Sequence, residues 1–260
     1  MAVKLSVLAS GSRGNSIYVA TEKVALLIDA GLSARAIEER LQAIGAIAAE
    51  LDGLVVTHEH LDHVRGIGTL SRRYGLPVYV NEQTYRHLPD VVGELADRVE
   101  FVTGQSFAIA DLDVHPFAIS HDAVDPVGLT LVNGITKVGI CTDLGVATRL
   151  VYHHLQRCQA LVLEANHDLE MLKNGPYPWA LKQRIRSRAG HLSNEETGEI
   201  LAAVLNEDLR EVILAHLSET NNCPQTAVKS LRTCLAEHRC QHWRLQVACQ
   251  HRPTEMLILP

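Results

Sequence analysis

Four side chains of types that bind metal ions lie within six positions of one short segment. They are His58, His60, Asp62 and His63. Neutral imidazole and carboxylate groups are ligands that Zn²⁺, Mn²⁺ and Fe²⁺ accept. A single histidine usually belongs to a solvated loop, but four ligand-type residues in this spacing, directly after an apolar run, favour a metal site. The chemistry indicated is that of a metal-dependent enzyme or of a metal-stabilised binding protein.

The elements around this segment decide where its ligands point. The apolar residues 54–56 predict a β-strand that leads into the histidines. On an extended chain, side chains two positions apart share one side, so His58 and His60 can converge on one metal ion. The chain must then turn, which would direct Asp62 and His63 at a second point nearby.

Length and composition limit the class of protein. The 260 residues are enough for a sizeable core, and 47% of them are apolar, so a globular protein is expected. No apolar run approaches the roughly 20 residues of a membrane span. The first residues alternate like a strand, unlike a signal peptide, so a cytoplasmic location is expected. The net charge of −6 gives no general attraction to nucleic acid, which leaves that task to local basic patches and bound cations.

The six cysteines include no C-x-x-C pair and do not resemble a disulfide framework, which fits a reducing compartment. A second group of ligand-type residues lies near the C-terminus. Its members are Cys234, His238, Cys240, His242, Cys249 and His251. Their spacing matches no standard zinc module, and whether they bind a metal stays open.

Apolar runs and capping residues predict a mixed α/β (α+β) chain. Strands are expected at residues 3–8, 17–20, 25–31, 54–56, 76–80, 99–102, 106–109, 112–119, 127–132, 137–141, 160–163, 211–215 and 243–248. Helices are expected after Ser33, after Asn81, after the capping box at 193–196 and from Pro224. No Ser/Pro-rich linker separates the halves, so one domain of two sheets with outer helices fits best.

Further ligand-type residues follow other predicted strands. Asp29 ends one of them, where a carboxylate can accept a hydrogen bond from a ligand histidine and fix its orientation. His121, Asp143 and His216 end three later strands. Separated residues can meet at one rim of a sandwich, but the pattern alone does not show that these do. Each of them could equally be a polar residue of a solvated loop.

The pattern H-x-H-x-D-H at residues 58–63 resembles the most specific motif of the metallo-β-lactamase superfamily. The resemblance implies a four-layer αββα sandwich, here a single domain over residues 1–260. It also implies two metal sites. His58, His60 and His121 would hold one metal; Asp62, His63 and His216 would hold the other. Asp143 would bridge the two metals, and Asp29 would support the ligands.

Six motifs narrow the resemblance to the YycJ (WalJ) group, relatives of tRNase Z and RNase J that are associated with 5′→3′ exonuclease activity on DNA. They lie at residues 10–15, 57–60, 120–123, 164–168, 190–194 and 216–222. The group implies a phosphodiester hydrolase with two divalent ions, Zn²⁺, Mn²⁺ or Fe²⁺, and DNA in preference to RNA as its substrate. The alternatives are a small-molecule (cyclic) phosphodiesterase of the same fold and a non-catalytic, metal-stabilised nucleic-acid-binding or regulatory protein.

The implied mechanism uses a metal-bridging hydroxide to attack the phosphorus, with the metal ligand Asp62 at the reaction centre. His191 resembles the histidine that nuclease-type members place near the scissile phosphate, where it could protonate the leaving oxygen. His167 is a second candidate of the same kind. The alternatives are a capping-loop histidine beside Ser193 for His191 and a structural role for His167.

Substrate contacts are expected from three places. Ser12 and Asn15 lie in a Gly-rich loop that could hold a phosphate or simply form a turn. Arg184 and Arg188 lie in the basic segment before His191, which could contact phosphates or form a solvated face. Asn222, in the last motif, is assigned to the substrate with them. Oligomeric state stays open.

Overall fold

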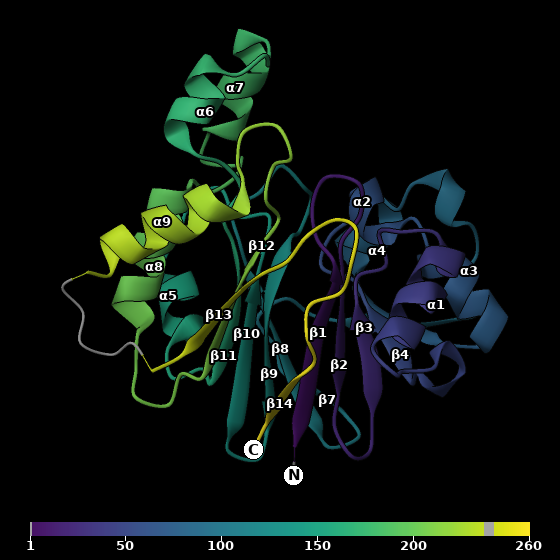
Figure 1. Ribbon diagram of the computed structural model, residues 1–260. Helices are drawn as coiled ribbons and strands as arrows, with labels where there is room; N and C mark the ends of the chain where they lie inside the picture. The colour runs from purple at the N-terminus through teal and green to yellow at the C-terminus, as the bar shows by residue number, and fades with distance from the viewer. Residues whose placement is uncertain (1, 237–241) are drawn as a thin grey trace.

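Two seven-stranded sheets pack face to face in the computed structural model, which describes residues 2–236 and 242–260 (Figure 1). The first sheet has the order β14-β1-β2-β3-β4-β5-β6, and the second has the order β13-β12-β11-β10-β9-β8-β7. The strands of the first sheet are β1 (Val3–Ala9), β2 (Ser16–Ala20), β3 (Ala25–Ile28), β4 (Gly53–Val55), β5 (Pro77–Asn81), β6 (Asp97–Phe101) and β14 (Leu257–Leu259). Those of the second sheet are β7 (Phe107–Ile109), β8 (Leu112–Ala118), β9 (Val127–Asn133), β10 (Thr136–Cys141), β11 (Ala160–Glu164), β12 (Glu211–Ala215) and β13 (Arg244–Val247).

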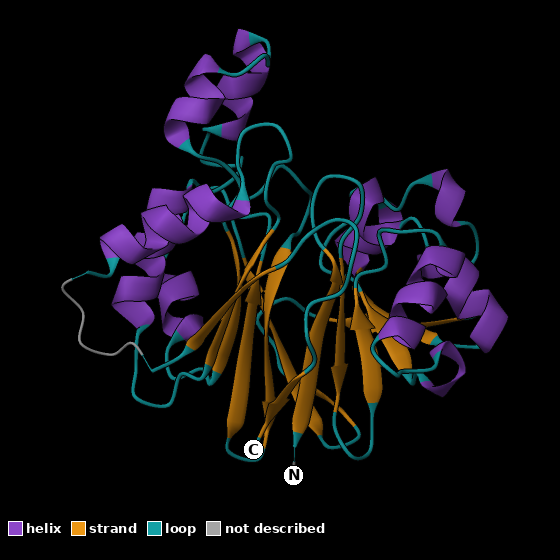
Figure 2. Cartoon of the chain, viewed as in Figure 1, coloured by secondary structure: helices purple, strands orange, loops and turns teal. Residues whose placement is uncertain are grey.

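Helices cover the outer face of each sheet (Figure 2). They are α1 (Ala34–Ala43), α2 (Leu61–Val64), α3 (Ile67–Tyr74), α4 (Glu82–Arg86), α5 (Arg149–Leu155), α6 (Leu169–Asn174), α7 (Trp179–Ile185), α8 (Asn194–Val204) and α9 (Pro224–Cys234), with short 3₁₀ turns at Ala48–Glu50 and Asp90–Val92. Helices α1 and α3 pack on the first sheet, and α5, α8 and α9 pack on the second. No helix within residues 2–236 and 242–260 is long and apolar enough to cross a membrane.

Apolar residues on both faces of the central strands build this four-layer arrangement. In β11, Val162 points into the core between the sheets, whereas Leu161 and Leu163 pack under the helices of the second sheet. The same alternation places Leu26 in the inner core and Leu27 under α1. Strands buried on both faces read as continuous apolar runs, as these do. The predicted αββα sandwich of two mixed sheets is confirmed.

The predicted capping residues start their helices as expected. Ser33 caps α1 by accepting a hydrogen bond from the Ala36 amide. Asn81 caps α4, where its side chain accepts from the Thr84 amide at 2.7 Å. The capping box of α8 is complete, since Ser193 and Glu196 each bond to the other's backbone amide. Local sequence therefore fixes where these helices begin.

Strand direction gathers the functional loops at one rim. Strands β3, β4 and β5 run parallel in the first sheet, and β10, β11 and β12 run parallel in the second. The loops after β4, β8, β10 and β12 meet at a rim opposite the chain termini (Figure 1).

The predicted strands between residues 97 and 141 are divided between the sheets, and some elements are not predicted. The strand near residue 99 is β6, which pairs parallel with β5 in the first sheet, whereas β7, β8, β9 and β10 after it form an antiparallel run in the second. Strand β14 and helices α5, α6 and α7 are not predicted, because their patterns are short or mixed. Of the C-terminal group, His238 and Cys240 lie outside the described residues, and Cys234 and Cys249 are free thiols.

Candidate metal centre

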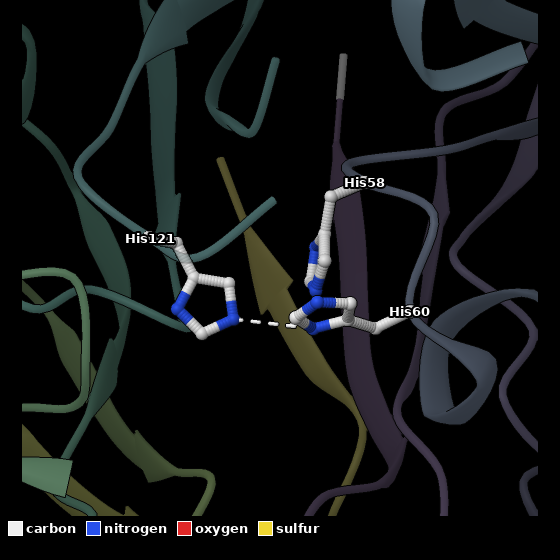
Figure 3. A group of neighbouring side chains, drawn as sticks. All are labelled: His58, His60 and His121. Atoms are coloured by element: carbon white, nitrogen blue, oxygen red, sulfur yellow. Dashed lines mark hydrogen bonds between the residues drawn. The ribbon is translucent and has the colours of Figure 1, made fainter. Parts of the chain in front are cut away.

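Three histidines from two loops face one another at the rim (Figure 3). His58 and His60 follow β4, and His121 follows β8. Nδ1 of His60 lies 3.3 Å from Nε2 of His121, and one ring nitrogen from each histidine lies within 4.8 Å of the other two. The structure thus brings together the residues expected to hold the first metal.

The second expected group lies beside the first. Helix α2 carries Asp62 and His63, whose Oδ2 and Nε2 atoms lie 3.8 Å apart. Oδ2 of Asp143 lies 3.2 Å from Nε2 of His63 and 3.4 Å from Nδ1 of His216. Oδ1 of the same carboxylate lies 3.8 Å from Nε2 of His121 in the first group. Asp143 therefore stands between the two groups.

Unpaired polar atoms in this cluster fit a bound cation. Nε2 of His58, Oδ2 of Asp143 and Nδ1 of His216 are buried with no hydrogen-bond partner among the described residues. A buried polar atom left unsatisfied costs about 1–3 kcal/mol, so three such atoms in one cluster need an explanation. Divalent cations that accept imidazole and carboxylate ligands provide it. The residues present thus fit the metal ions that the sequence predicts.

Local electrostatics keep His58 neutral and Asp143 ionised. At His63 burial opposes protonation, but the carboxylates of Asp143 and Asp29 raise the pKa of its ring well above its usual range. Burial holds the pKa of His58 well below its usual range, so its ring stays neutral. Burial opposes ionisation of Asp143, yet His216 and His63 hold the pKa of its carboxyl well below its usual range. A neutral imidazole and an ionised carboxylate are the forms that bind metal.

Asp29 lies against His63 and Thr57 and orients the His63 ring, which is the supporting position that the sequence predicts. Its carboxylate accepts hydrogen bonds from the Thr57 amide at 2.8 Å and the Thr57 hydroxyl at 2.7 Å. It also lies 2.8 Å from Nδ1 of His63. A proton held on Nδ1 leaves the Nε2 lone pair facing Asp143, which is the usual task of a carboxylate behind a ligand histidine.

Three of these residues have left-handed backbones. The φ angles are 60° at Asp29, 58° at Asp143 and 54° at His216. Each residue comes just after a strand, where an unusual turn of the chain directs its side chain into the cluster. Such a backbone in a non-glycine residue costs about 1–3 kcal/mol and persists only where its surroundings hold it, often at functional sites.

Glu164, which the sequence analysis did not assign to the site, forms a pair with His191. The Glu164 side chain is fully buried, and its Oε1 lies 2.7 Å from Nδ1 of His191. Its Oε2 accepts hydrogen bonds from the amides of Leu144 and Leu192. Burial opposes protonation of His191, but the Glu164 carboxylate raises the pKa of His191 to about 9. The signals in the sequence are the place of Glu164 as an acidic residue at the end of an apolar strand and as the first residue of the motif at 164–168.

The two predicted proton-transfer residues occupy different places. His191 lies at the cluster, with Nδ1 3.9 Å from Oδ1 of Asp143. His167 is buried beside α8, where its carbonyl accepts from the Asn194 amide, and the potential ligand groups do not include it. Burial lowers the pKa of His167 to about 4, so its ring is neutral. The structure does not bring His167 to the cluster.

The predicted substrate residues separate in the same way. Ser12 and Arg184 line a cavity of about 230 Å³ that also touches His191. Arg188 is exposed on the loop after α7. Asn15 is buried under the cluster, with Nδ2 3.3 Å from Oδ2 of Asp62 and 3.0 Å from Nε2 of His63.

Asn222 is held inside the protein. It exchanges hydrogen bonds of 2.8 and 3.1 Å with Asn194 and donates to the Ala165 carbonyl. Neither Asn15 nor Asn222 lines the cavity. Their buried side-chain amides already form hydrogen bonds with protein groups, as buried polar groups usually do. The structure therefore does not favour the prediction that these two residues contact substrate.

Comparisons with known proteins agree with this geometry. Residues 25–217 match the model of the β-lactamase superfamily domain. The chain is 38% identical over 239 residues to the exodeoxyribonuclease YycJ of Bacillus anthracis, covering 91% of this chain and 90% of that protein. It is 37% identical over 238 residues to the exodeoxyribonuclease WalJ of Streptococcus pneumoniae serotype 2 (strain D39), covering 90% and 88%.

A solved structure supports the fold. The metallo-β-lactamase fold protein YhfI from Bacillus subtilis matches with a TM-score of 0.75 at 16% identity. The match covers 97% of this chain and 98% of that one, so the whole sandwich is shared.

Proposed function

Because the chain belongs to the β-lactamase superfamily and, within it, to the family of the exodeoxyribonucleases YycJ and WalJ, we propose that it removes nucleotides from the 5′ end of DNA with the help of two divalent metal ions. Membership confirms the predicted family and the predicted metal-dependent hydrolase. The 5′→3′ direction, the identity of the metals and the roles of individual residues are parts of this proposal.

The position of Asp143 is the observation that supports two metal ions best. One of its oxygens faces His63 and His216, and the other faces His121. A carboxylate placed between two groups of imidazoles suits a bridge between two cations. We assign His58, His60 and His121 to one cation, Asp62, His63 and His216 to the other, and Asp143 to both.

The bound cations would lower the pKa of a shared water and stabilise negative charge on a phosphate oxygen. The protein's own residues supply the rest. Asp29 holds His63 in one tautomer, and Asn15 fixes the Asp62 carboxylate from below. Glu164 keeps His191 protonated beside the cluster, where the imidazolium neutralises phosphate charge or gives its proton to the leaving oxygen.

Labelled nucleic acids test this function directly. The substrates are duplex DNA, single-stranded DNA and RNA, each labelled at the 5′ or the 3′ end, with Mn²⁺ or Zn²⁺ added to the protein. We expect mononucleotides to be released stepwise from the 5′ end of DNA, and no release by His60→Ala, which controls for contaminating nuclease. Cleavage only of small phosphodiesters would contradict the proposal and favour a small-molecule phosphodiesterase.

A further inference from the structure

A cavity of about 230 Å³ lies beside the candidate metal centre. It touches His191, whose ring belongs to the same group of close ligand-type atoms as Asp143 and His216. The Gly-rich loop contributes Ser12 to its lining, and the segment that contains α7 contributes Tyr177, Leu181 and Arg184. A group bound in this cavity would therefore lie next to the reaction centre.

The wall made by α6 and α7 is a hairpin, residues 169–185, that stands beyond the strand ends (Figure 1). Lys182 ties its two helices together, since its ammonium donates to the carbonyls of Lys173 and Gly175, both at 2.7 Å. The base of the hairpin is tightly packed, because a Cβ on Gly175 would lie 2.4 Å from Oδ1 of Asn221. The hairpin thus has an internal tie and a close-packed base, which limit its movement relative to the cavity.

Tyr177 lies in the connection between α6 and α7. It lies between Pro176 and Pro178, and the two proline rings fix the φ angles on either side of it. A residue before proline is itself restricted to extended backbone, so the backbone at Tyr177 has little freedom to lose on binding. The ring is half-buried and lines the cavity.

Arg184 brings a guanidinium group to the same cavity, where it is paired with Asp122, which also lines the cavity. Its Nε and Nη2 atoms pair with Oδ2 of Asp122 at 2.7 and 2.5 Å, which anchors the hairpin to the loop of His121. Arginine has five donors, so the Nη1 donors stay available for a phosphate. An aromatic face with an arginine beside it is how proteins bind unpaired nucleotides.

We propose that this cavity holds the 5′-terminal nucleobase of a single DNA strand, stacked on the Tyr177 ring, with Arg184 on the adjoining phosphate. The inference rests on the proposed function and names the form of its substrate. The cavity is smaller than the roughly 300–1,000 Å³ of typical small-molecule sites, so we expect it to admit one unpaired base and not a base pair. A paired end must therefore open before its first nucleotide can enter.

The test measures stacking without cleavage. The protein is loaded with Zn²⁺ and titrated with a short single strand that has phosphorothioate linkages and the fluorescent base 2-aminopurine at its 5′ end. We expect the fluorescence to fall on binding to the wild type and to Tyr177→Phe. Tyr177→Ala and Tyr177→Leu should lose this quenching and bind about tenfold more weakly, which is the usual effect of losing one stacked base.

A strand with a 5′-terminal abasic residue separates stacking from simple loss of structure. The wild type should bind it about tenfold more weakly than the intact strand, whereas Tyr177→Leu should bind the two strands equally. Trp179→Ala is the matched control, since Trp179 is 72% exposed on the same hairpin and does not line the cavity. It should keep both the quenching and the preference for the intact strand.

The outcomes separate the inference from the function on which it rests. Equal preference for the intact strand in the wild type and Tyr177→Leu would overturn the inference, even if the protein degrades DNA. Quenching that depends on Tyr177, in a protein that degrades no DNA, would keep the binding site and overturn the nuclease function instead.

Discussion

The two sheets contribute to the candidate metal centre in different ways. The first sheet supplies His58, His60, Asp62 and His63 from one segment, the loop after β4 and the helix α2 that follows it. The second sheet supplies its residues singly, after β8, β10 and β12 and before α8. The first half of the site is therefore a local structure, whereas the second half exists only once four distant segments are packed together.

Both halves nevertheless contain a buried carboxylate that lies against the Nδ1 atom of a histidine. Asp29 lies 2.8 Å from His63, and Glu164 lies 2.7 Å from His191. The two histidines have different neighbours. Nε2 of His63 faces the Asp143 carboxylate, whereas His191 lines the cavity. We infer that Asp29 serves metal binding and that Glu164 serves the substrate.

Asp143→Asn should have the largest effect, because Asp143 joins the two halves. Loss of the bridging charge should lower hydrolysis by at least about 10³-fold, since it removes several kcal/mol of charge stabilisation by the metals. Label release from the 5′ end of DNA measures this, with circular dichroism as the check on folding. Full activity in a folded Asp143→Asn protein would refute the two-metal arrangement.

Glu164→Gln should lower kcat by about 10²-fold and leave metal content unchanged. Glutamine keeps the shape of the side chain but removes the charge that keeps His191 protonated, and proton transfer typically contributes 10²–10⁴-fold. Metal analysis of the purified variant, beside its kcat, measures both effects. A variant that loses metal would make Glu164 a ligand and remove the difference between the halves.

Asp29→Asn should weaken metal binding by about 10–100-fold, the usual effect of losing a partner behind a ligand. Activity should then return when metal is added in excess, because the ligands themselves are intact. Metal titrations of the Asp29→Asn and Glu164→Gln proteins provide a matched pair. If excess metal rescues both variants or neither, the two carboxylates do not have separate tasks.

The difference between the halves also explains how much the sequence could predict. The H-x-H-x-D-H segment is visible because its ligands are neighbours in the chain and follow an apolar run. Most strands and the capped helices were predicted for the same reason, since their patterns are local. His121, Asp143 and His216 each resemble an ordinary loop residue, and only the family resemblance selected them.

What the sequence could not provide depends on packing. Glu164 is an acidic residue at a strand end until burial places it against His191. The sequence predicts that Asn222 contacts substrate, because its motif gives its type and position but not its partner, Asn194. The left-handed backbones at Asp143 and His216 are likewise set by tertiary contacts, since neither residue type requires them.

The smallest expected effect concerns His154, which lies on α5, outside the metal centre, and has no carboxylate partner among the described residues. His154 stacks between Phe117 and His115, and burial, with the nearby His115, His153 and Lys137, lowers its pKa to about 4. His191, behind which Glu164 lies, has a pKa of about 9 instead. The carboxylate, more than burial, therefore decides which histidine is charged at neutral pH.

The low pKa of His154 links its charge to stability. Below about pH 6.5, the ordinary pKa of histidine, the unfolded chain binds a proton at this position that the folded chain does not bind until about pH 4. Acidification between these values should thus destabilise the wild type more than His154→Gln. Unfolding midpoints from pH 7 to pH 5 measure this slope. His87→Gln, which removes an exposed imidazole that is not among the groups lowering this pKa, is the control, and an equal change of slope in both variants would contradict the assignment to His154.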